Sequence, residues 1–167
     1  KKKVYDFSKG IRAISSSIRR SIPAFLDSKI HHNNMLSLVI AKMHANIAGY
    51  DAAVMLDERG FIAELNDTNL FMVKANKVFT PFPHACLPGI TRGTFIELLK
   101  ENNIEIEERD LTLVEFINAD LVFATGTNGE ITPVTEMDGR AIKCDHNFLE
   151  KIKNLFEAKL PSLCEPL

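Results

Sequence analysis

Hydrophobic and polar positions alternate near the start of the chain and then change to a helical period. Residues 9–20 are rich in β-branched side chains at alternating positions and predict a strand, which residues 23–28 interrupt. The next apolar positions are three to four residues apart and predict a helix: Leu36, Val39, Ile40 and Met43. We expect Asn33 or Asn34 to cap its start and Gly49 to end it in a left-handed conformation.

Three short β-type runs follow this helix, at residues 53–56, 61–64 and 70–80. Residues 57–60 are expected to form a tight turn between the first two runs, because they include the Asp and Gly that turns favour. This pattern predicts a β-meander.

The second half of the chain alternates between helical and β-type segments. The pattern predicts a helix at about residues 91–101, a strand at 104–107, a short helix near 113–118 and a strand at 121–125. An amphipathic helix follows, with apolar side chains on one face: Phe148, Ile152, Leu155 and Phe156. The predicted fold class is therefore a mixed α/β domain, and no repeat or linker divides residues 1–167.

Composition narrows the class of protein further. The 167 residues are 46% hydrophobic and carry a formal net charge of −2, with acids and bases interspersed. Apolar stretches such as residues 36–40 and 121–124 are far shorter than the roughly 20 residues that cross a bilayer. A chain so nearly neutral also lacks the basic field that collects nucleic acid or anionic lipid. We predict a protein with neither membrane nor nucleic-acid partners.

Three cysteines, an odd number without metal-ligand spacing, indicate reduced thiols and hence a cytoplasmic location: Cys86, Cys144 and Cys164. The histidines do not change this picture. His31 and His32 are adjacent, so they face opposite sides of any strand, and His44 and His84 lie outside recognised ligand spacings. No metal site is predicted.

Two segments have the character of anion-binding turns. Residues 87–92 place a Gly and a Thr at the start of a predicted helix, where backbone N–H groups lack partners and the helix dipole is positive. The alternative is a structural Thr cap after a Pro-Gly turn. Residues 123–129 leave a hydrophobic strand through small and polar residues, so a ligand could approach the backbone there, although many strands end in this way without binding anything.

Glu64 ends the second β-type run and is followed by polar residues. A carboxylate at this place could pair with the nitrogen of a ligand ring. The alternative is a solvated acid at a strand end, which is the usual environment of a single Glu.

Taken in order, these segments resemble the large domain of the fold type IV aminotransferases, a family that includes branched-chain and D-amino-acid aminotransferases and aminodeoxychorismate lyase. The resemblance extends from about Gly10 to Ile142. Its most specific parts are residues 55–64, 69–71, 80–81, 87–92 and the stretch from 119 to 134. It implies the pseudo-barrel fold of that C-terminal domain and pyridoxal 5'-phosphate as the cofactor.

The resemblance also implies roles for individual residues. Glu64 takes the position of the carboxylate that keeps the pyridine nitrogen protonated, so that the ring can accept electrons from the substrate. Residues 87–91, through Leu87, Ile90 and Thr91, match the segment that binds the cofactor, and Thr127 matches a second phosphate contact. Asn128 is expected beside the substrate carboxylate.

The family's Schiff-base lysine is expected just before the helix at residue 36, and there the chain departs from the pattern. Aligning the helix places His31 at that position, while Lys29 is the nearest lysine. If the segment is extended, both side chains point the same way, with Lys29 one pleat, roughly 6.6 Å, further back. Three interpretations stay open: His31 as a non-covalent base, Lys29 as a displaced Schiff base, or no catalysis.

The function implied is amino-group transfer between a branched-chain or similar apolar amino acid and a 2-oxo acid. The alternatives are a catalytically silent homologue, and a D-amino-acid aminotransferase or lyase on the same scaffold. Family members carry an N-terminal small domain that this chain lacks, and residues 10–20 resemble the strand after the interdomain linker. We therefore expect a part of a longer, homodimeric enzyme.

Overall fold

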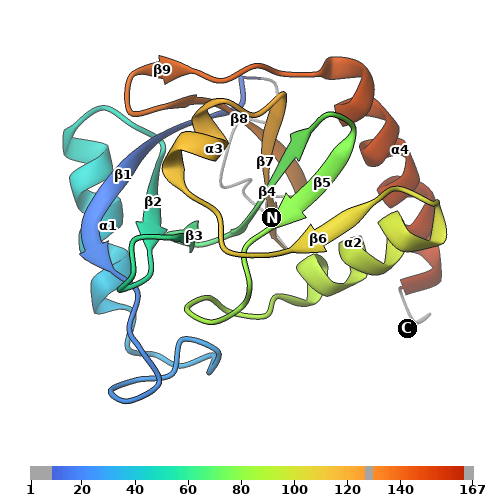
Figure 1. Ribbon diagram of the computed structural model, residues 1–167. Coiled ribbons are helices and arrows are strands. Elements are labelled where there is room, and N and C mark those ends of the chain that lie inside the picture. The colour runs from blue at the N-terminus through green and yellow to red at the C-terminus, as the bar shows by residue number, and fades with distance from the viewer. Residues whose placement is uncertain (1–8, 127–129, 164–167) are drawn as a thin grey trace.

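The computed structural model describes residues 9–126 and 130–163. Within these ranges the helices are α1 (Leu36–Ile47), α2 (Ile90–Glu101), α3 (Leu113–Ile117) and α4 (His146–Leu163). The strands are β1 (Ile11–Arg19), β2 (Ala52–Leu56), β3 (Ile62–Leu65), β4 (Asn69–Lys74), β5 (Lys77–Thr80), β6 (Ile106–Glu108), β7 (Leu121–Gly126), β8 (Glu130–Met137) and β9 (Arg140–Ala141). The predicted mixed α/β class is confirmed, with helices on different sides of one curved sheet (Figure 1).

The sheet has the strand order β3-β2-β1-β8-β7-β4-β5-β6, with β9 paired to β8. Strand β1 is central and runs parallel to both β2 and β8. Strand β3 pairs antiparallel with β2, so that Glu64 lies opposite Met55. The end of β1 therefore lies beside the end of β2, which pairs with the start of β3, although β1 is far from both strands in the sequence.

The stretch predicted as a meander forms two separate hairpins, β2–β3 and β4–β5, which lie in different parts of the sheet. The single run predicted at residues 70–80 is wrong in one respect, because it is broken at Ala75 and Asn76, whose φ angles are 49° and 64°. Two successive left-handed residues form the kind of turn that matches the twist of a two-residue hairpin. Alternation alone did not reveal it, since the apolar pattern continues on both sides.

A cluster of aromatic side chains fixes α2 against the sheet. The Phe71 and Phe123 rings stack 5.2 Å apart, and Phe95 of α2 meets both edge-on at 5.3 and 5.4 Å. All three are fully buried. Burying each is worth roughly 1.5–3 kcal/mol, and each favourable ring pair adds about 0.5–1.5 kcal/mol. The packing of Phe95 against the sheet thus fixes the position of the α2 N-terminus, which lies about one turn before Phe95.

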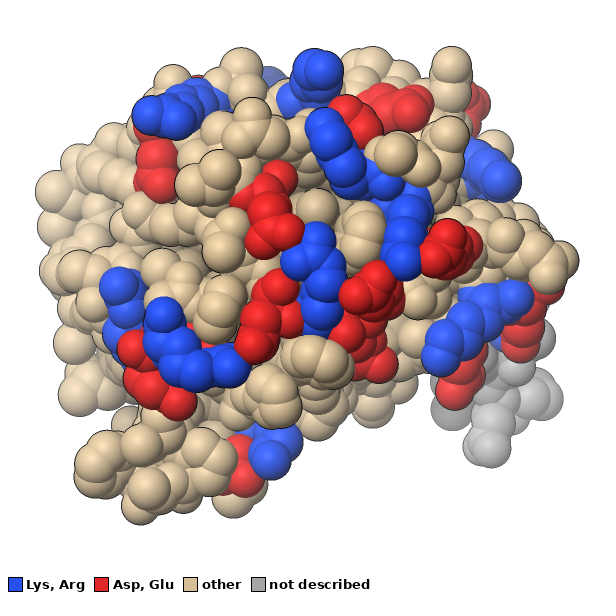
Figure 2. Space-filling view, viewed as in Figure 1, with Lys and Arg blue, Asp and Glu red and all other residues tan. Residues whose placement is uncertain are grey.

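Helix α1 packs differently from the other helices. Only its small residues Ala41 and Ala45 are fully buried, where they contact β1 and β2. The apolar series that predicts the helix includes exposed side chains: Leu36, Val39, Met43 and Ile47. Figure 2 shows this side of the molecule largely free of charged side chains, whereas acids and bases are interspersed over the rest of the face.

The ends of α1 test the capping prediction. Its N-cap is Met35, and no side-chain hydrogen bond caps it, so the prediction that Asn33 or Asn34 does so is wrong. The Asn33 carbonyl instead accepts a hydrogen bond from the Met35 N–H. Gly49 follows the last turn with a φ of 80°, as predicted. Among the described residues, no helix is long and apolar enough to span a membrane.

Candidate functional site

Four segments of the chain surround a cavity of about 620 Å³. They are the loop between β1 and α1, the turn after β3, the start of α2 and the end of β7. In Figure 1 the β1–α1 loop and the segment that leads into α2 lie at the lower side of the molecule. The cavity brings together six of the predicted site residues: Lys29, His31, Glu64, Leu87, Ile90 and Thr91. Two others, Thr127 and Asn128, lie outside the described residues.

Glu64 is buried on β3, with only 6% of its surface exposed, so the alternative of a solvated acid is wrong. Burial raises the pKa of its carboxyl from the ordinary 4.5 to about 7. The charge of Arg20 and a hydrogen bond from the Leu87 backbone oppose this rise in pKa, while Asp67 adds to it. Near neutral pH this carboxyl is therefore poised between its charged and neutral forms.

Arg20 is a site residue that sequence reasoning missed. Its Nε lies 2.9 Å from Glu64 Oε1, and both side chains are buried. The same Nε donates to the Ala85 carbonyl at 3.0 Å, and the Arg20 N–H donates to the Leu56 carbonyl. An Arg at the end of a strand is usually solvated. Only the strand order of the sheet places it beside Glu64, so the local pattern carried no signal.

Asn69 links the carboxylate to the start of α2. Its Nδ2 donates to the Leu87 carbonyl at 2.9 Å and makes a longer contact of 3.4 Å to Glu64 Oε2. A Cβ on Gly89 would collide with Asn69 Oδ1. A glycine at position 89 therefore leaves room for the Asn69 side chain to pack against the start of α2.

The N-terminus of α2 is open to the cavity. Its N-cap is Gly89, which makes no side-chain cap, and Thr91 lies inside the first turn. The predicted alternative of a structural Thr cap is therefore wrong. The first backbone N–H groups of a helix have no intrahelical partner, and they attract anions together with the helix dipole. Ile90 is 88% exposed here, which leaves its backbone accessible.

Two buried hydroxyl groups at the cavity lack partners among the described residues. They are Thr68 Oγ1 and Thr125 Oγ1, and Thr125 is only 1% exposed. Thr125 pairs with Asn69 across β4 and β7. A buried hydroxyl without a partner costs about 1–3 kcal/mol. Two such hydroxyl groups at one cavity are expected where the site binds a polar ligand.

Lys29 and His31 lie on the opposite side, on the exposed loop between β1 and α1. The Ile30 N–H donates to the Asp27 carbonyl, so residues 27–30 form a turn, and the condition of an extended segment is not met there. Lys29 Nζ lies 3.6 Å from Asp27 Oδ2, and 47% of its side chain is exposed. Ser28 anchors the loop through a 2.8 Å hydrogen bond to the Ser21 carbonyl. Despite the turn, both Lys29 and His31 line the cavity.

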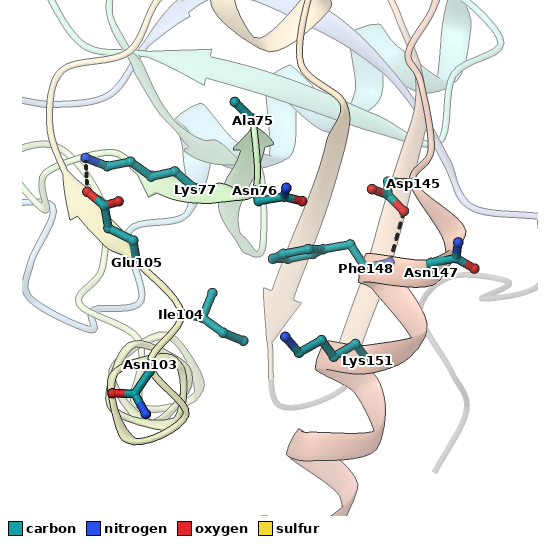
Figure 3. Close-up of a pocket in the computed structure, with 10 residues that line it drawn as sticks. All are labelled: Ala75, Asn76, Lys77, Asn103, Ile104, Glu105, Asp145, Asn147, Phe148 and Lys151. Carbon is teal, nitrogen blue, oxygen red and sulfur yellow. Dashed lines mark hydrogen bonds and ion pairs between the residues drawn. The ribbon is translucent and has the colours of Figure 1, made fainter.

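A second hollow, of about 580 Å³, lies between the β4–β5 turn, the end of α2 and the start of α4 (Figure 3). Several of its polar groups are paired with one another. Lys77 Nζ lies 2.6 Å from Glu105 Oε1, and Asp145 accepts a hydrogen bond from the Phe148 N–H. None of the unpartnered buried atoms found in the described part of the chain lines this hollow. The cavity around Glu64 is therefore the stronger candidate.

Sequence comparisons identify the family of the chain. The family model for amino-transferase class IV matches residues 1–137. The chain is 51% identical over 139 residues to a branched-chain-amino-acid aminotransferase-like protein 2 of Arabidopsis thaliana, covering 83% of this chain and 25% of that protein. It is 43% identical over 151 residues to a putative branched-chain-amino-acid aminotransferase of Methanocaldococcus jannaschii, covering 89% and 52%. The chain thus spans a quarter to about half of these relatives.

Solved structures show the same relationship. A branched-chain amino acid aminotransferase of T.th., complexed with N-(5'-phosphopyridoxyl)-L-glutamate, superposes with a TM-score of 0.88 at 31% identity, covering 95% of this chain and 54% of that one. The branched-chain aminotransferase of Thermoproteus uzoniensis, solved with norvaline, gives a TM-score of 0.90 at 30% identity, covering 96% and 54%.

Proposed function

The chain belongs to the class IV aminotransferase family, and from that membership we propose that it is the cofactor-holding part of a pyridoxal-phosphate-dependent branched-chain aminotransferase. The observation that carries the proposal is one cavity with a buried carboxylate, an open helix N-terminus and buried hydroxyls that have no partner within residues 9–126 and 130–163. Because the chain spans a quarter to about half of its relatives, the activity is proposed for the intact protein that contains it.

The residues around the cavity fit the cofactor. A phosphate dianion suits the first turn of α2, where the backbone N–H groups of residues 90 and 91 and the Thr91 hydroxyl can donate to it. Thr125 Oγ1 and Thr68 Oγ1 are buried donors that need an acceptor. Glu64 can accept a hydrogen bond from a protonated ring nitrogen. The predicted contacts from Leu87, Thr127 and Asn128 complete the proposed site.

When bound, the cofactor supplies an aldehyde and a protonated ring that accepts electrons from the substrate's α-carbon. The protein has to hold that ring, provide an amine and move a proton. Of the two loop residues, we assign the amine to Lys29, because a primary amine can condense with an aldehyde with loss of water and an imidazole cannot. Lys29 Nζ can then carry the proton to and from the substrate within the cavity, and His31 is a neighbour without a covalent role.

The substrate assignment rests on the relatives' names and on the predicted contact of Asn128 with a carboxylate. We propose branched-chain or similar apolar L-amino acids as donors and 2-oxo acids as acceptors. A catalytically silent homologue is the second candidate, and a D-amino-acid enzyme or a lyase on the same scaffold is the third. The exposure of Lys29 and its pairing with Asp27 favour the silent homologue over the lyase.

Turnover by the intact protein tests the proposal. With added pyridoxal 5'-phosphate, we expect leucine, isoleucine and valine to donate their amino groups to 2-oxoglutarate. Activity restricted to D-amino acids, or release of ammonia or pyruvate from other substrates, would move the assignment to the third candidate. Absence of any turnover, with cofactor bound, would establish the silent homologue.

The proposal includes a homodimer in the cytoplasm. The exposed apolar face of α1, formed by Leu36, Val39, Met43 and Ile47, supports a second copy as its cover. We expect Val39→Glu to lower the mass of the intact protein in light scattering to that of a monomer. An unchanged mass would remove this face from the dimer interface.

A further inference from the structure

The pair formed by Arg20 and Glu64 lies deeper than the cavity wall. Arg20 Nε is 2.9 Å from Glu64 Oε1, and the two side chains are 7% and 8% exposed. We propose that Arg20 is a positioning residue that holds Glu64 as an anion and directs its second oxygen toward the cofactor ring, an inference that rests on the proposed function.

The contacts of Arg20 keep its guanidinium in place. Its backbone N–H donates to the Leu56 carbonyl, which ties it to the end of β2. Its Nε also donates to the Ala85 carbonyl at 3.0 Å, on the segment that leads to α2. The side chain is thus held between the sheet and the α2 segment. It can fix Oε1 without entering the cavity, since Arg20 is not among the residues that line it.

The two oxygens of Glu64 differ as a result. Oε1 has a short charge-assisted contact with Arg20, whereas Oε2 has the longer 3.4 Å contact with Asn69. The Arg20 Nε–H is donated to the Ala85 carbonyl, so its contact with Oε1 stabilises the carboxylate through charge. Glu64 itself lines the cavity, and Oε2 is the oxygen that Arg20 does not contact.

Electrostatics explain why the pair matters. Burial is the largest influence on the Glu64 carboxyl and raises its pKa to about 7 even with Arg20 present. Asp67 raises that pKa further, and the Leu87 N–H lowers it. The neighbouring Cys86 thiol is neutral, because burial raises its pKa to about 12. Arg20 is therefore the one full positive charge among the groups that lower the pKa of Glu64.

Loss of that charge would leave Glu64 protonated at neutral pH, and a protonated acid cannot neutralise a ring N–H⁺. The other basic residues at the cavity, Lys29 and His31, lie on the exposed loop and are not among the causes of the Glu64 shift. They cannot replace Arg20. An opposite charge within about 4–6 Å changes a carboxyl pKa by roughly 1–3 pH units.

The direct test is the titration of Glu64 in the intact protein without cofactor, followed by NMR of ¹³Cδ-labelled glutamate, with Glu64→Gln to assign the signal. Arg20→Gln keeps a donor for Ala85 but removes the charge. We expect the Glu64 midpoint to rise by about one pH unit or more in Arg20→Gln and to stay within about half a unit of wild type in Arg20→Lys.

Two results would overturn the proposal in this titration. One is an unchanged midpoint in Arg20→Gln. The other is a rise of a full pH unit in the Glu64 midpoint of Arg20→Lys, which keeps the charge. This second result decides the question if Arg20→Gln does not fold. Arg59→Gln is the matched control, because Arg59 also pairs with carboxylates, Asp57 and Asp110, but does not line the cavity. It should leave the Glu64 midpoint unchanged.

Cofactor binding provides the second readout. In Arg20→Gln the dissociation constant of pyridoxal 5'-phosphate at pH 7 should rise about tenfold, and the loss should shrink as the pH is raised. In a Glu64→Gln background Arg20→Gln should have no further effect. Additive losses would show that Arg20 acts independently of Glu64. If wild type binds no cofactor, the proposed function fails, and the NMR titration still decides the role of Arg20.

Discussion

The two sides of the cavity are built in opposite ways. On one side, Arg20, Glu64 and Asn69, which we call the carboxylate wall, are buried and joined to one another and to the start of α2. On the other side, residues 21–35, the lysine loop, hold Lys29 by a turn and an exposed contact with Asp27. The wall is formed before a ligand arrives, whereas the loop is tied to the sheet by few contacts.

This difference separates two tasks. Groups that bind a charged ring and a phosphate gain most from being fixed and shielded from water, because the strength of each charge–charge contact rises as the dielectric falls. An amine that forms and breaks a covalent bond needs access to substrate and solvent. The wall carries a cost in stability that only a ligand can offset, so substitutions on the two sides should affect activity and stability differently.

The largest expected effect comes from the lysine loop. Lys29→Ala should lower turnover by the intact protein by at least about 10²–10⁴-fold, since both the amine and its proton transfer are lost. His31→Ala should have a much smaller effect, and neither change should alter the free energy of unfolding by more than about 0.5 kcal/mol, because both residues are exposed. Steady-state kinetics and urea unfolding measure the two quantities. The reverse ranking would make His31 the base.

The carboxylate wall predicts a pH-dependent effect on stability. The folded-state pKa of Glu64 is raised from 4.5 to about 7, so its contribution to the free energy of unfolding is fully present below pH 4.5 and is lost as the pH rises through 7. Relative to Glu64→Gln, the cofactor-free wild type should lose about 3 kcal/mol of stability between pH 4.5 and 8.

Urea unfolding of both proteins across this pH range isolates Glu64, because all other titrating groups are common to the two. A pH-independent difference would mean that Glu64 is not buried as an acid. The same Glu64→Gln change should lower turnover, since an amide cannot neutralise the cofactor ring.

The smallest effect concerns the unpartnered hydroxyl. Thr125→Val should weaken pyridoxal 5'-phosphate binding by about 0.5–1.5 kcal/mol while leaving the cofactor-free protein as stable as wild type or more stable. Thr80→Val is the matched control, because the buried Thr80 hydroxyl already donates to the Leu70 carbonyl at 2.8 Å. It should lower stability without changing cofactor affinity. Equal behaviour of the two variants, by fluorescence titration and thermal unfolding, would contradict the assignment of Thr125.

How much of this could be predicted from the sequence depends on the range of the interactions. The strand ending at Arg19, the turn before Gly60 and the start of α2 were predictable, because each is determined by a local pattern or by the special conformations of glycine and proline. Glu64 and the segment around Thr91 were found for the same reason, since each stands at a recognisable end of an element.

The rest of the site depends on contacts that no local pattern records. Arg20 meets Ala85, 65 positions away, only because β1, β2 and β3 are neighbours in the sheet. Thr125 looks like an ordinary strand residue until its hydroxyl is found without a partner among the described residues. Residues 27–30 form a turn, because the Asp27 carboxylate and carbonyl accept hydrogen bonds from the N–H groups of Lys29 and Ile30.

Borohydride reduction of the intact protein with pyridoxal 5'-phosphate, followed by peptide mass spectrometry, identifies the amine opposite Glu64. We predict a single phosphopyridoxyl label, on Lys29, and its loss in Lys29→Ala while the carboxylate wall still binds the cofactor reversibly. A label on any other lysine, or a protein that binds the cofactor and carries no label after reduction, would contradict the assignment of Lys29.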